Sequence, residues 1–275
     1  MVTDSDGFPT SDFFQRGVHL IENGGVTETI FNNVVGIYLR GAETGCIPSM
    51  VNYANCYLSQ YKPHLALPFL LEGAIRGHPD AVALLLCRCY ANLPQFSLYF
   101  YWSNMVKNWA GIEEERYKQF FGGAKKMKNQ FDNTCCICSE QQSDLVDLKT
   151  CNGCKLSFYC SKECQTIHWE ERNHKNECNQ LKILMKYHKP YANEIREQIM
   201  SGDDPKSIIP LQKLRNKLGL TRPRKEYEEY LDLKNLDNDL DTSTSTTNDD
   251  TINPHTLLIP RNNGTVYVGS WTETM

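Results

Sequence analysis

The most informative stretch of the chain spans residues 133–178 and reads NTCCICSEQQSDLVDLKTCNGCKLSFYCSKECQTIHWEERNHKNEC. Zn²⁺ prefers four cysteine or histidine ligands in a tetrahedron, and a C-x2-C turn presents two thiolates at a suitable separation. Eight such ligands are enough for two complete sites, so we expect two Zn²⁺ ions per chain. They have the spacing Cys135-x2-Cys138-x12-Cys151-x2-Cys154-x5-Cys160-x3-Cys164-x9-His174-x3-Cys178.

A disulfide framework and a catalytic cysteine are the alternatives to zinc. The opening residues MVTDSDGFPTSDFF lack the basic and apolar regions of a secretory signal peptide, which argues against disulfides. Short paired turns favour closed structural sites over one reactive thiol. We therefore expect an intracellular protein, cytoplasmic or nuclear. The other cysteines agree, since four of the five lie in apolar helical surroundings typical of free buried thiols: Cys46, Cys56, Cys87, Cys89 and Cys136.

Residues 133–178 resemble a MYND zinc finger, most specifically in the stretch YCSKECQ (159–165) followed by Trp169 and the H-x3-C turn. The resemblance implies that the ligands interleave. Spacing alone does not distinguish this arrangement from a sequential one. One ion would be held by Cys135, Cys138, Cys160 and Cys164, and the other by Cys151, Cys154, His174 and Cys178.

The identity of the seventh ligand has one alternative. The interval from Gln165 to Asn173 is two residues longer than is common in the family, and it contains a second histidine, His168. We prefer His174 because only this histidine forms the H-x3-C turn with Cys178.

The residues around the third cysteine pair predict two short strands and a helix. Apolar residues lie on either side of the CNGC turn (151–154), and the run after Cys164 has helical spacing. Structural zinc contributes on the order of 10 kcal/mol or more of folding free energy, so chelation should unfold this region. The apolar residues are Leu145, Val146 and Leu148 before the turn and Leu156, Phe158 and Tyr159 after it.

The finger does not have the basic surface that phosphate recognition needs. Five Lys or Arg residues face eight Asp or Glu residues between positions 132 and 178, which argues against DNA binding by the finger. In the MYND family the finger takes up short proline-containing peptides. The resemblance implies that Gln165 and Trp169 are the peptide-binding residues, with the peptide adding alongside the small sheet. Alternatively, Trp169 only covers the zinc core.

The amino-terminal half contains an internal recurrence. RGAETG (40–45) returns as EGAIRG (72–77), and each stretch is followed by a run that ends in Cys-Tyr. A period of about 33 residues is typical of a two-helix repeat. The region resembles Sel1-like repeats, relatives of the tetratricopeptide solenoids, over about residues 25–109. This implies a protein-docking surface, and an ordinary helical bundle is the alternative. The matching positions are Ala66, Ala74, Gly77, Ala81 and Tyr90.

These observations predict a mainly α protein: a helical-repeat, solenoid-like domain, then a small two-zinc cross-brace finger, then a helical and partly disordered tail. The net charge of −4 and the short apolar runs give no indication of a membrane partner. The expected units are a flexible amino terminus (1–10), the helical repeats (11–130, with a connecting helix at 112–130), the finger (133–178), a helical extension (179–235), a disordered linker (236–252) and a hairpin tail around Asn263-Gly264 (253–275).

The segment from Lys206 to Lys225 is basic and amphipathic. It carries seven Lys or Arg residues and no acid, with Ile208, Leu211, Leu214 and Leu218 on one helical face. Such a helix binds nucleic acid, an anionic membrane or a protein partner, or is the solvated face of its own domain.

An enzyme is the rival class to an adaptor, because MYND fingers also occur in SET-domain lysine methyltransferases. The residues after Cys178 contain no Asn-His-x-Cys stretch and no glycine-rich cofactor loop, and the amino-terminal half shows no catalytic constellation. We therefore expect no enzyme. The predicted function is a zinc-binding adaptor whose finger takes up proline-containing peptides and whose repeats dock a second protein. The alternatives are a SET-like methyltransferase relative, or a nucleic-acid-associated regulator that uses residues 206–225.

Overall fold

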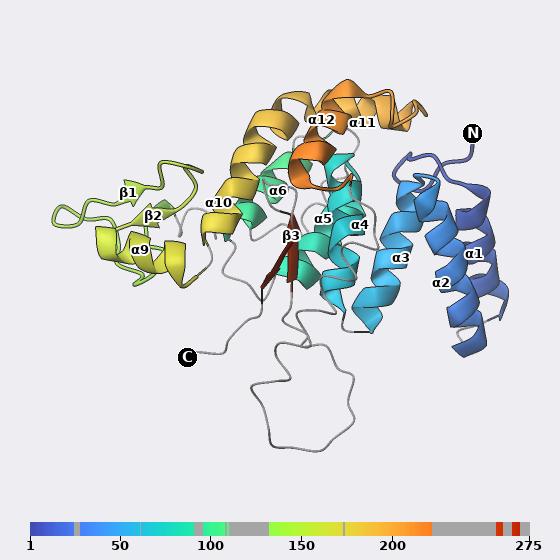
Figure 1. Ribbon diagram of the computed structural model, residues 1–275, viewed down its shortest axis with the longest axis horizontal. Helices are drawn as coiled ribbons and strands as arrows, with labels where there is room; N and C mark the ends of the chain where they lie inside the picture. The colour runs from blue at the N-terminus through green and yellow to red at the C-terminus, as the bar shows by residue number, and fades with distance from the viewer. Residues whose placement is uncertain are drawn as a thin grey trace, which may run out of the picture.

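The computed structural model describes residues 1–24, 28–60, 62–90, 96–107, 109, 132–172, 174–221, 257–260 and 266–269. These residues are mainly helical, which confirms the mainly α part of the predicted fold class, whereas the solenoid-like arrangement stays a prediction. The finger lies at one end of the molecule and helices α1 and α2 lie at the other (Figure 1). The connecting helix expected at 112–130 and the linker expected at 236–252 both lie outside the described residues.

The amino-terminal half is a series of helices in which chain neighbours pack together. Contacts join α1 to α2, α2 to α3, α3 to α4 and α4 to α5. Helices α3, α4 and α5 each have proline in the first turn, where its missing N–H removes no helical hydrogen bond. The helices are α1 (Asp12–Gly24), α2 (Glu28–Glu43), α3 (Ile47–Ser59), α4 (Pro63–Ile75), α5 (Pro79–Leu84), the π-helical η1 (Leu85–Tyr90) and α6 (Phe96–Lys107).

The two recurring glycine stretches form equivalent helix ends. Gly45 after α2 and Gly77 after α4 have φ values of 92° and 87°, a left-handed conformation that glycine adopts without strain. The N–H of the next residue donates to the carbonyl of Gly41 in the first turn and of Gly73 in the second, at 3.1 Å in both. The recurrence therefore encodes a repeated helix–turn–helix unit. Its assignment to the Sel1-like family stays a prediction.

The chain after the finger returns across the helical half. Buried residues of α3 to α6, of the finger and of the following helices belong to one continuous hydrophobic core. The boundary expected at residue 178 therefore does not separate two cores. The returning elements are α10 (His174–Ile183), the π-helical η2 (Leu184–His188), the 3₁₀-helical η3 (Lys189–Tyr191), α11 (Ala192–Met200) and α12 (Ile209–Leu218).

Three polar contacts fasten this return segment to the helical half. The Tyr101 hydroxyl lies 2.8 Å from Nδ1 of His188, and the Arg196 guanidinium donates to the carbonyl of Gly77 at 2.6 Å. Arg215 forms an ion pair with Glu72 at 2.7 Å. These groups join residues that are far apart in the sequence.

The first ten residues, expected to be a flexible amino terminus, pack against the helices. Thr3 and Pro9 form an antiparallel bridge, and Phe8 is fully buried in the core. Asp4 accepts hydrogen bonds from the backbone and lies 3.0 Å from the His78 ring. Burial of one aromatic side chain and this polar contact hold the segment against the helices.

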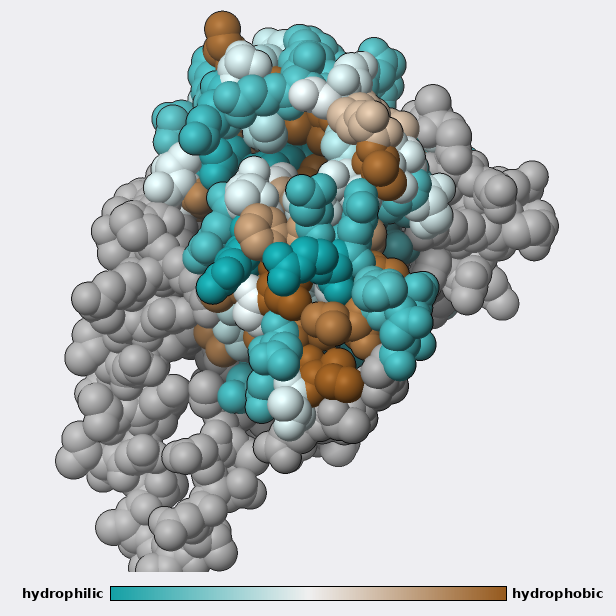
Figure 2. Space-filling view, turned by 90° about the vertical axis from the view of Figure 1, so that its right-hand side faces the viewer, coloured by the Kyte–Doolittle hydropathy of each residue, from teal (hydrophilic) through white to brown (hydrophobic). Residues whose placement is uncertain are grey.

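Figure 2 shows the end of the molecule formed by α1 and α2, where hydrophobic side chains are scattered among hydrophilic ones. On α1, Leu20 and Ile21 are exposed. A second, small core made of Val34, Tyr38 and Tyr53 lies beneath this end.

The described residues of the tail form two short strands. Strands β3 (Leu257–Pro260) and β4 (Val266–Gly269) pair antiparallel, on either side of the turn predicted at Asn263-Gly264, which lies outside the described residues.

Cys87 is exposed, contrary to the expectation of a buried thiol, whereas Cys46 and Cys89 are buried. Among the helices that the structure describes, none has the length and apolar character to cross a membrane.

Candidate metal centres

The finger consists of a two-stranded sheet, one helix and the beginning of α10, which carries His174 and Cys178. Strands β1 (Lys149–Thr150) and β2 (Phe158–Tyr159) pair antiparallel, followed by α9 (Lys162–Glu170). The apolar strand expected before the CNGC turn is largely wrong, because Leu145 is 96% exposed and β1 holds only Lys149 and Thr150. Metal ligands supply the structure there, so this short segment needs no apolar burial of its own.

The first ligand cluster consists of Cys135, Cys138, Cys160 and Cys164, whose sulfur atoms lie within 4.8 Å of one another. The sulfur atoms of Cys138 and Cys160 are 3.4 Å apart, and those of Cys160 and Cys164 are 3.7 Å apart. Ser161 caps α9, and its hydroxyl accepts from the backbone N–H of Cys164 at 3.2 Å. The cap fixes the start of the helix that carries the fourth ligand.

The second cluster consists of Cys151, Cys154, His174 and Cys178, all buried. The sulfur atoms of Cys151 and Cys178 are 3.8 Å apart. Nε2 of His174 lies 3.5 Å from the Cys151 sulfur and 3.7 Å from the Cys154 sulfur. The two clusters interleave along the chain, as the family resemblance implied.

These separations match tetrahedral zinc. With Zn–S near 2.3 Å and Zn–N near 2.0 Å, a regular tetrahedron has S···S edges of about 3.8 Å and S···N edges of about 3.5 Å. None of the described cysteines forms a disulfide. The donor sets, three thiolates with one imidazole and four thiolates, are those of closed structural zinc sites. The finger therefore has two clusters positioned for zinc, consistent with two ions per chain.

The electrostatics of both clusters favour a cation. Burial alone would raise the pKa of the Cys135 thiol, but hydrogen bonds from nearby backbone N–H groups lower it to about 6. Hydrogen bonds from Cys154 and Cys178 lower the pKa of the Cys151 thiol far below its ordinary range. Hydrogen bonds within the clusters raise the pKa of Cys160 and Cys178, so a divalent cation is needed to hold every ligand in the metal-binding thiolate form.

The structure distinguishes the two candidate histidines. His174 points Nε2 at the second cluster, whereas His168 stacks on His174, with ring centroids 4.3 Å apart and planes 12° from parallel. Burial lowers the pKa of His168 to about 3, so its ring is neutral, and the Tyr159 hydroxyl lies 2.8 Å from its Nδ1. The preference for His174 in the cluster is correct, and His168 supports the ligand from the side.

Glu177 contacts the ligand histidine at the ring nitrogen that faces away from the cluster. This carboxylate is 1% exposed, and its Oε2 lies 2.7 Å from Nδ1 of His174. The contact selects the tautomer with hydrogen on Nδ1, which leaves Nε2 free for the metal. Its Oε1 accepts from the backbone N–H groups of Ser97 and Leu98, at 3.0 and 3.2 Å. One carboxylate therefore joins the second cluster to the first turn of α6.

The sequence contained one signal for this role. Glu177 stands three residues after His174, a helical spacing that places both side chains on one face. The contact with α6 had no such signal, because Ser97 lies 80 positions away.

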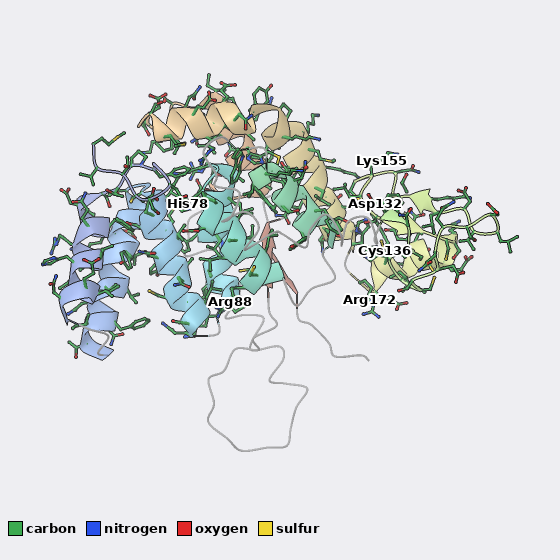
Figure 3. The ribbon with its side chains drawn as sticks, turned by 180° about the vertical axis from the view of Figure 1, so that it is seen from behind. His78, Arg88, Asp132, Cys136, Lys155 and Arg172 are labelled. Carbon is green, nitrogen blue, oxygen red and sulfur yellow. The ribbon has the colours of Figure 1, made fainter. Side chains whose placement is uncertain are left out.

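Two smaller positions also shape the centres. A Cβ on Gly153 would lie 2.4 Å from the Cys178 sulfur, so only glycine fits between the ligands Cys151 and Cys154. Cys136 is not in either cluster, and its sulfur accepts from the backbone N–H of Phe158 at 3.3 Å. Figure 3 shows Cys136 with Lys155 and Arg172 on the finger, separated from His78 and Arg88 on the helical half.

The two residues expected to bind peptide both lie on α9. Gln165 and Trp169 are four residues apart, on one helical face, and each is half-buried. The Trp169 ring lies 6.0 Å from the His174 ring, edge to face. Trp169 thus packs against the second cluster while keeping part of its surface accessible.

The sheet edge beside β2 is partly occupied. Phe158 points its backbone groups away from β1, and its carbonyl accepts from the N–H of Cys136 at 2.9 Å. Among the described residues, no other backbone segment pairs with the exposed edge of β1 at Lys149 and Thr150.

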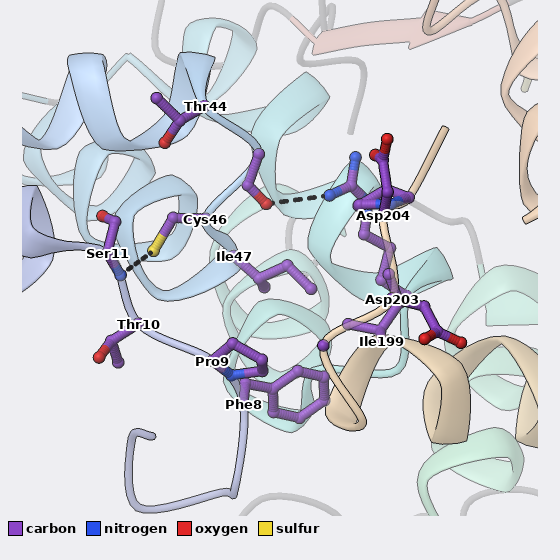
Figure 4. Close-up of a pocket in the computed structure, with 14 residues that line it drawn as sticks. Phe8, Pro9, Thr10, Ser11, Thr44, Cys46, Ile47, Ile199, Asp203 and Asp204 are labelled. Carbon is purple, nitrogen blue, oxygen red and sulfur yellow. Dashed lines mark hydrogen bonds between the residues drawn. The ribbon is translucent and has the colours of Figure 1, made fainter. Parts of the chain in front are cut away.

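The helical half contains a cavity of about 230 Å³ between the amino-terminal segment, the α2–α3 turn and the α11–α12 loop (Figure 4). Apolar residues such as Phe8 and Ile47 form part of its wall. Arg76 also lines it, and the guanidinium donates to the carbonyl of Gly45 at 3.1 Å. Asp203 and Asp204 close the opposite side.

Comparison with known proteins agrees with this geometry. Residues 135–178 match the family model of the MYND finger and form a MYND zinc finger. A SET and MYND domain-containing protein of Dictyostelium discoideum is 42% identical over 53 residues, which cover 18% of this chain and only 9% of that protein. No solved structure matches the chain significantly.

Proposed function

We propose that this chain is a zinc-dependent adaptor whose finger binds short proline-containing peptides. The observation that carries the proposal is the MYND finger with Gln165 and Trp169 together on the accessible face of α9. A half-buried tryptophan offers a flat apolar surface to a proline ring, and the neighbouring amide fixes the peptide by hydrogen bonds. The finger itself is a protein-interaction module.

Strand addition by the peptide is restricted by the sheet. Because Cys136 already covers Phe158 on the outer edge of β2, backbone pairing is left to the β1 edge at Lys149 and Thr150. The peptide would then depend mainly on side-chain contacts with α9. An affinity carried by few residues makes single substitutions informative.

A second protein would dock on the helical half. Its repeated helix–turn–helix units and the cavity beside Arg76 support this part of the proposal. The ligand thiols must stay reduced, so the adaptor would work in an intracellular, cytoplasmic or nuclear, compartment. We propose no catalytic activity, since both metal clusters have four protein ligands and leave no position for substrate.

Peptide binding by the zinc-loaded full-length chain tests the proposal. We expect Trp169→Ala and Gln165→Ala each to weaken binding to a proline-containing peptide library at least about tenfold, while zinc content stays at two ions. Thr166→Ala, on the exposed side of the same helix, is the matched control and should bind like the wild type. Unchanged peptide binding in both variants would reject Gln165 and Trp169 as the peptide-binding residues.

A SET-like methyltransferase relative is the alternative, favoured only by the name of the Dictyostelium protein. Calorimetry with S-adenosylmethionine separates the two functions. A saturable binding isotherm would favour the methyltransferase, and its absence together with peptide binding would favour the adaptor.

A further inference from the structure

Three lysines gather around one tyrosine on the face formed by η2 and α12. The ammonium nitrogens of Lys186, Lys213 and Lys217 lie 5.3, 5.5 and 6.0 Å from the centroid of the Tyr187 ring. We call these four residues the lysine–tyrosine cluster. Lys186 and Tyr187 come from the segment after the finger, whereas Lys213 and Lys217 are one turn apart on α12.

Within the part of the chain that the structure describes, no acidic group pairs with the cluster. Segments 179–191 and 205–221, which supply it, contain no Asp or Glu. Among the described residues, none of its lysines forms an ion pair, and all three are exposed. Cation–π contacts of about 0.5–1 kcal/mol each hold the ammonium groups near the ring, although they repel one another. The result is a preformed site of three positive charges.

Helix α12 is not free to bind a bilayer or a partner's groove through an apolar face. Its apolar residues Leu211, Leu214 and Leu218 are fully buried in the core of the protein. Ile209 at the first position is 79% exposed, but one residue at the helix end gives α12 no continuous apolar face for a bilayer or for the groove of a partner. Arg215 is engaged by Glu72. The accessible side of the helix is the one that carries Lys213 and Lys217, and it would attract a negatively charged ligand.

We propose that the lysine–tyrosine cluster binds single-stranded nucleic acid. Its lysines contact successive phosphates, and Tyr191, four residues beyond Tyr187 and 42% exposed, offers a ring on which a base stacks. The exposed ring of Tyr191, one helical turn beyond Tyr187, favours nucleic acid over an acidic protein, because a carboxylate-rich peptide uses the lysine charges but not the ring. The site is separate from the finger and independent of the function proposed for it.

Fluorescence anisotropy with labelled oligothymidylate and oligoadenylate, using the zinc-loaded full-length chain, tests this site. Three phosphate contacts on a single strand predict a log–log salt slope of about −2. The triple variant Lys186→Gln, Lys213→Gln, Lys217→Gln should lose at least about tenfold in affinity at low salt, together with most of the slope. Tyr191→Leu should lose about fivefold or more with the slope unchanged.

A matched triple variant controls for net charge. Lys107→Gln, Lys149→Gln and Lys162→Gln remove the same charge from exposed positions elsewhere and should bind like the wild type. Loss of affinity equal to that of the cluster variant would reject a localised site. Polyglutamate that competes as well as the oligonucleotide at equal charge would show an acidic-protein surface instead, and absence of binding at low salt would overturn the proposal.

Discussion

Glu177 accepts hydrogen bonds on both carboxylate oxygens, from His174 on one side and from Ser97 and Leu98 on the other. A glutamine at this position accepts on one side only, because its amide group is a donor. Metal-ligating histidines depend on such a partner for ring orientation and basicity. The charge and the geometry of this one residue therefore act on the second zinc cluster.

We expect Glu177→Gln to weaken zinc binding at the second cluster by about 10- to 100-fold and to leave the first cluster unchanged. Competition with a colorimetric chelator, followed ion by ion, measures this. Glu170→Gln on exposed α9 is the control. Wild-type retention of both ions in Glu177→Gln would show that the contact does not position the ligand.

His188 is a buried titratable group away from the metal clusters. It is completely buried, and the Tyr101 hydroxyl lies 2.8 Å from its Nδ1. Burial lowers the pKa of His188 to about 4. Since the unfolded chain takes up this proton near pH 6.5 and the folded chain does not, stability is lost as pH falls from about 6.5 toward 4.

We expect the wild type to lose about 1 kcal/mol more unfolding free energy than His188→Asn between about pH 7.5 and about pH 5.5. Urea denaturation at both pH values measures the difference. Loss of zinc on acidification affects both proteins equally, so it cancels in the difference between their unfolding free energies. Identical pH dependence in the two proteins would mean that folding leaves the pKa of His188 unchanged.

At the scale of the helices, two glycines in comparable positions have opposite surroundings. A Cβ on Gly73 in α4 would lie 2.7 Å from the Cβ of Ala81, where α4 and α5 pack closely. A Cβ on Gly36 in α2 would meet nothing within 4 Å. The first glycine permits close helix packing, whereas the second only lowers helix propensity.

Gly73→Ala should therefore destabilise the protein by about 1–3 kcal/mol through overpacking. Gly36→Ala should stabilise it by up to about 1 kcal/mol, because alanine is the better helix former. Chemical denaturation of both variants measures the contrast. Equal effects would contradict the close approach of α4 and α5 described above.

The main core of the described residues passes from the helical half through the second zinc cluster into α10 to α12. Ser97 extends the connection, since its hydroxyl lies 2.9 Å from that of Ser157 in the finger. Zinc thus stabilises the finger directly and the first turn of α6 through Glu177. The center of α4, by contrast, is buried among helices and has no contact with the clusters.

Removal of zinc with EDTA should abolish amide protection across residues 135–178, because structural zinc supplies on the order of 10 kcal/mol of folding free energy. We also expect faster exchange at the Ser97 and Leu98 amides, while Leu67 to Leu71 in α4 stay protected. Hydrogen exchange with mass spectrometry resolves these segments. Unchanged exchange at the start of α6 would show that the finger and the helices are not coupled.

The ligands of both clusters and the mainly helical class were predictable from the sequence. Zinc ligation depends on short turns such as Cys135-x2-Cys138, and helix formation depends on local periodicity, so both are encoded within a few residues. The recurring glycines were visible for the same reason. The two short strands were only partly predictable, because metal ligands replace the apolar burial on which strand signals depend.

Only the tertiary structure decided the pairing of the ligands and the roles of the residues around them. Spacing left both a sequential and an interleaved arrangement open, and the fold brings Cys135 to Cys160 and Cys151 to Cys178. The contact of Glu177 with Ser97 and the approach of Lys186 to Lys213 each join distant segments. Such contacts are set by how helices pack into one core, and no local pattern in the chain records that packing.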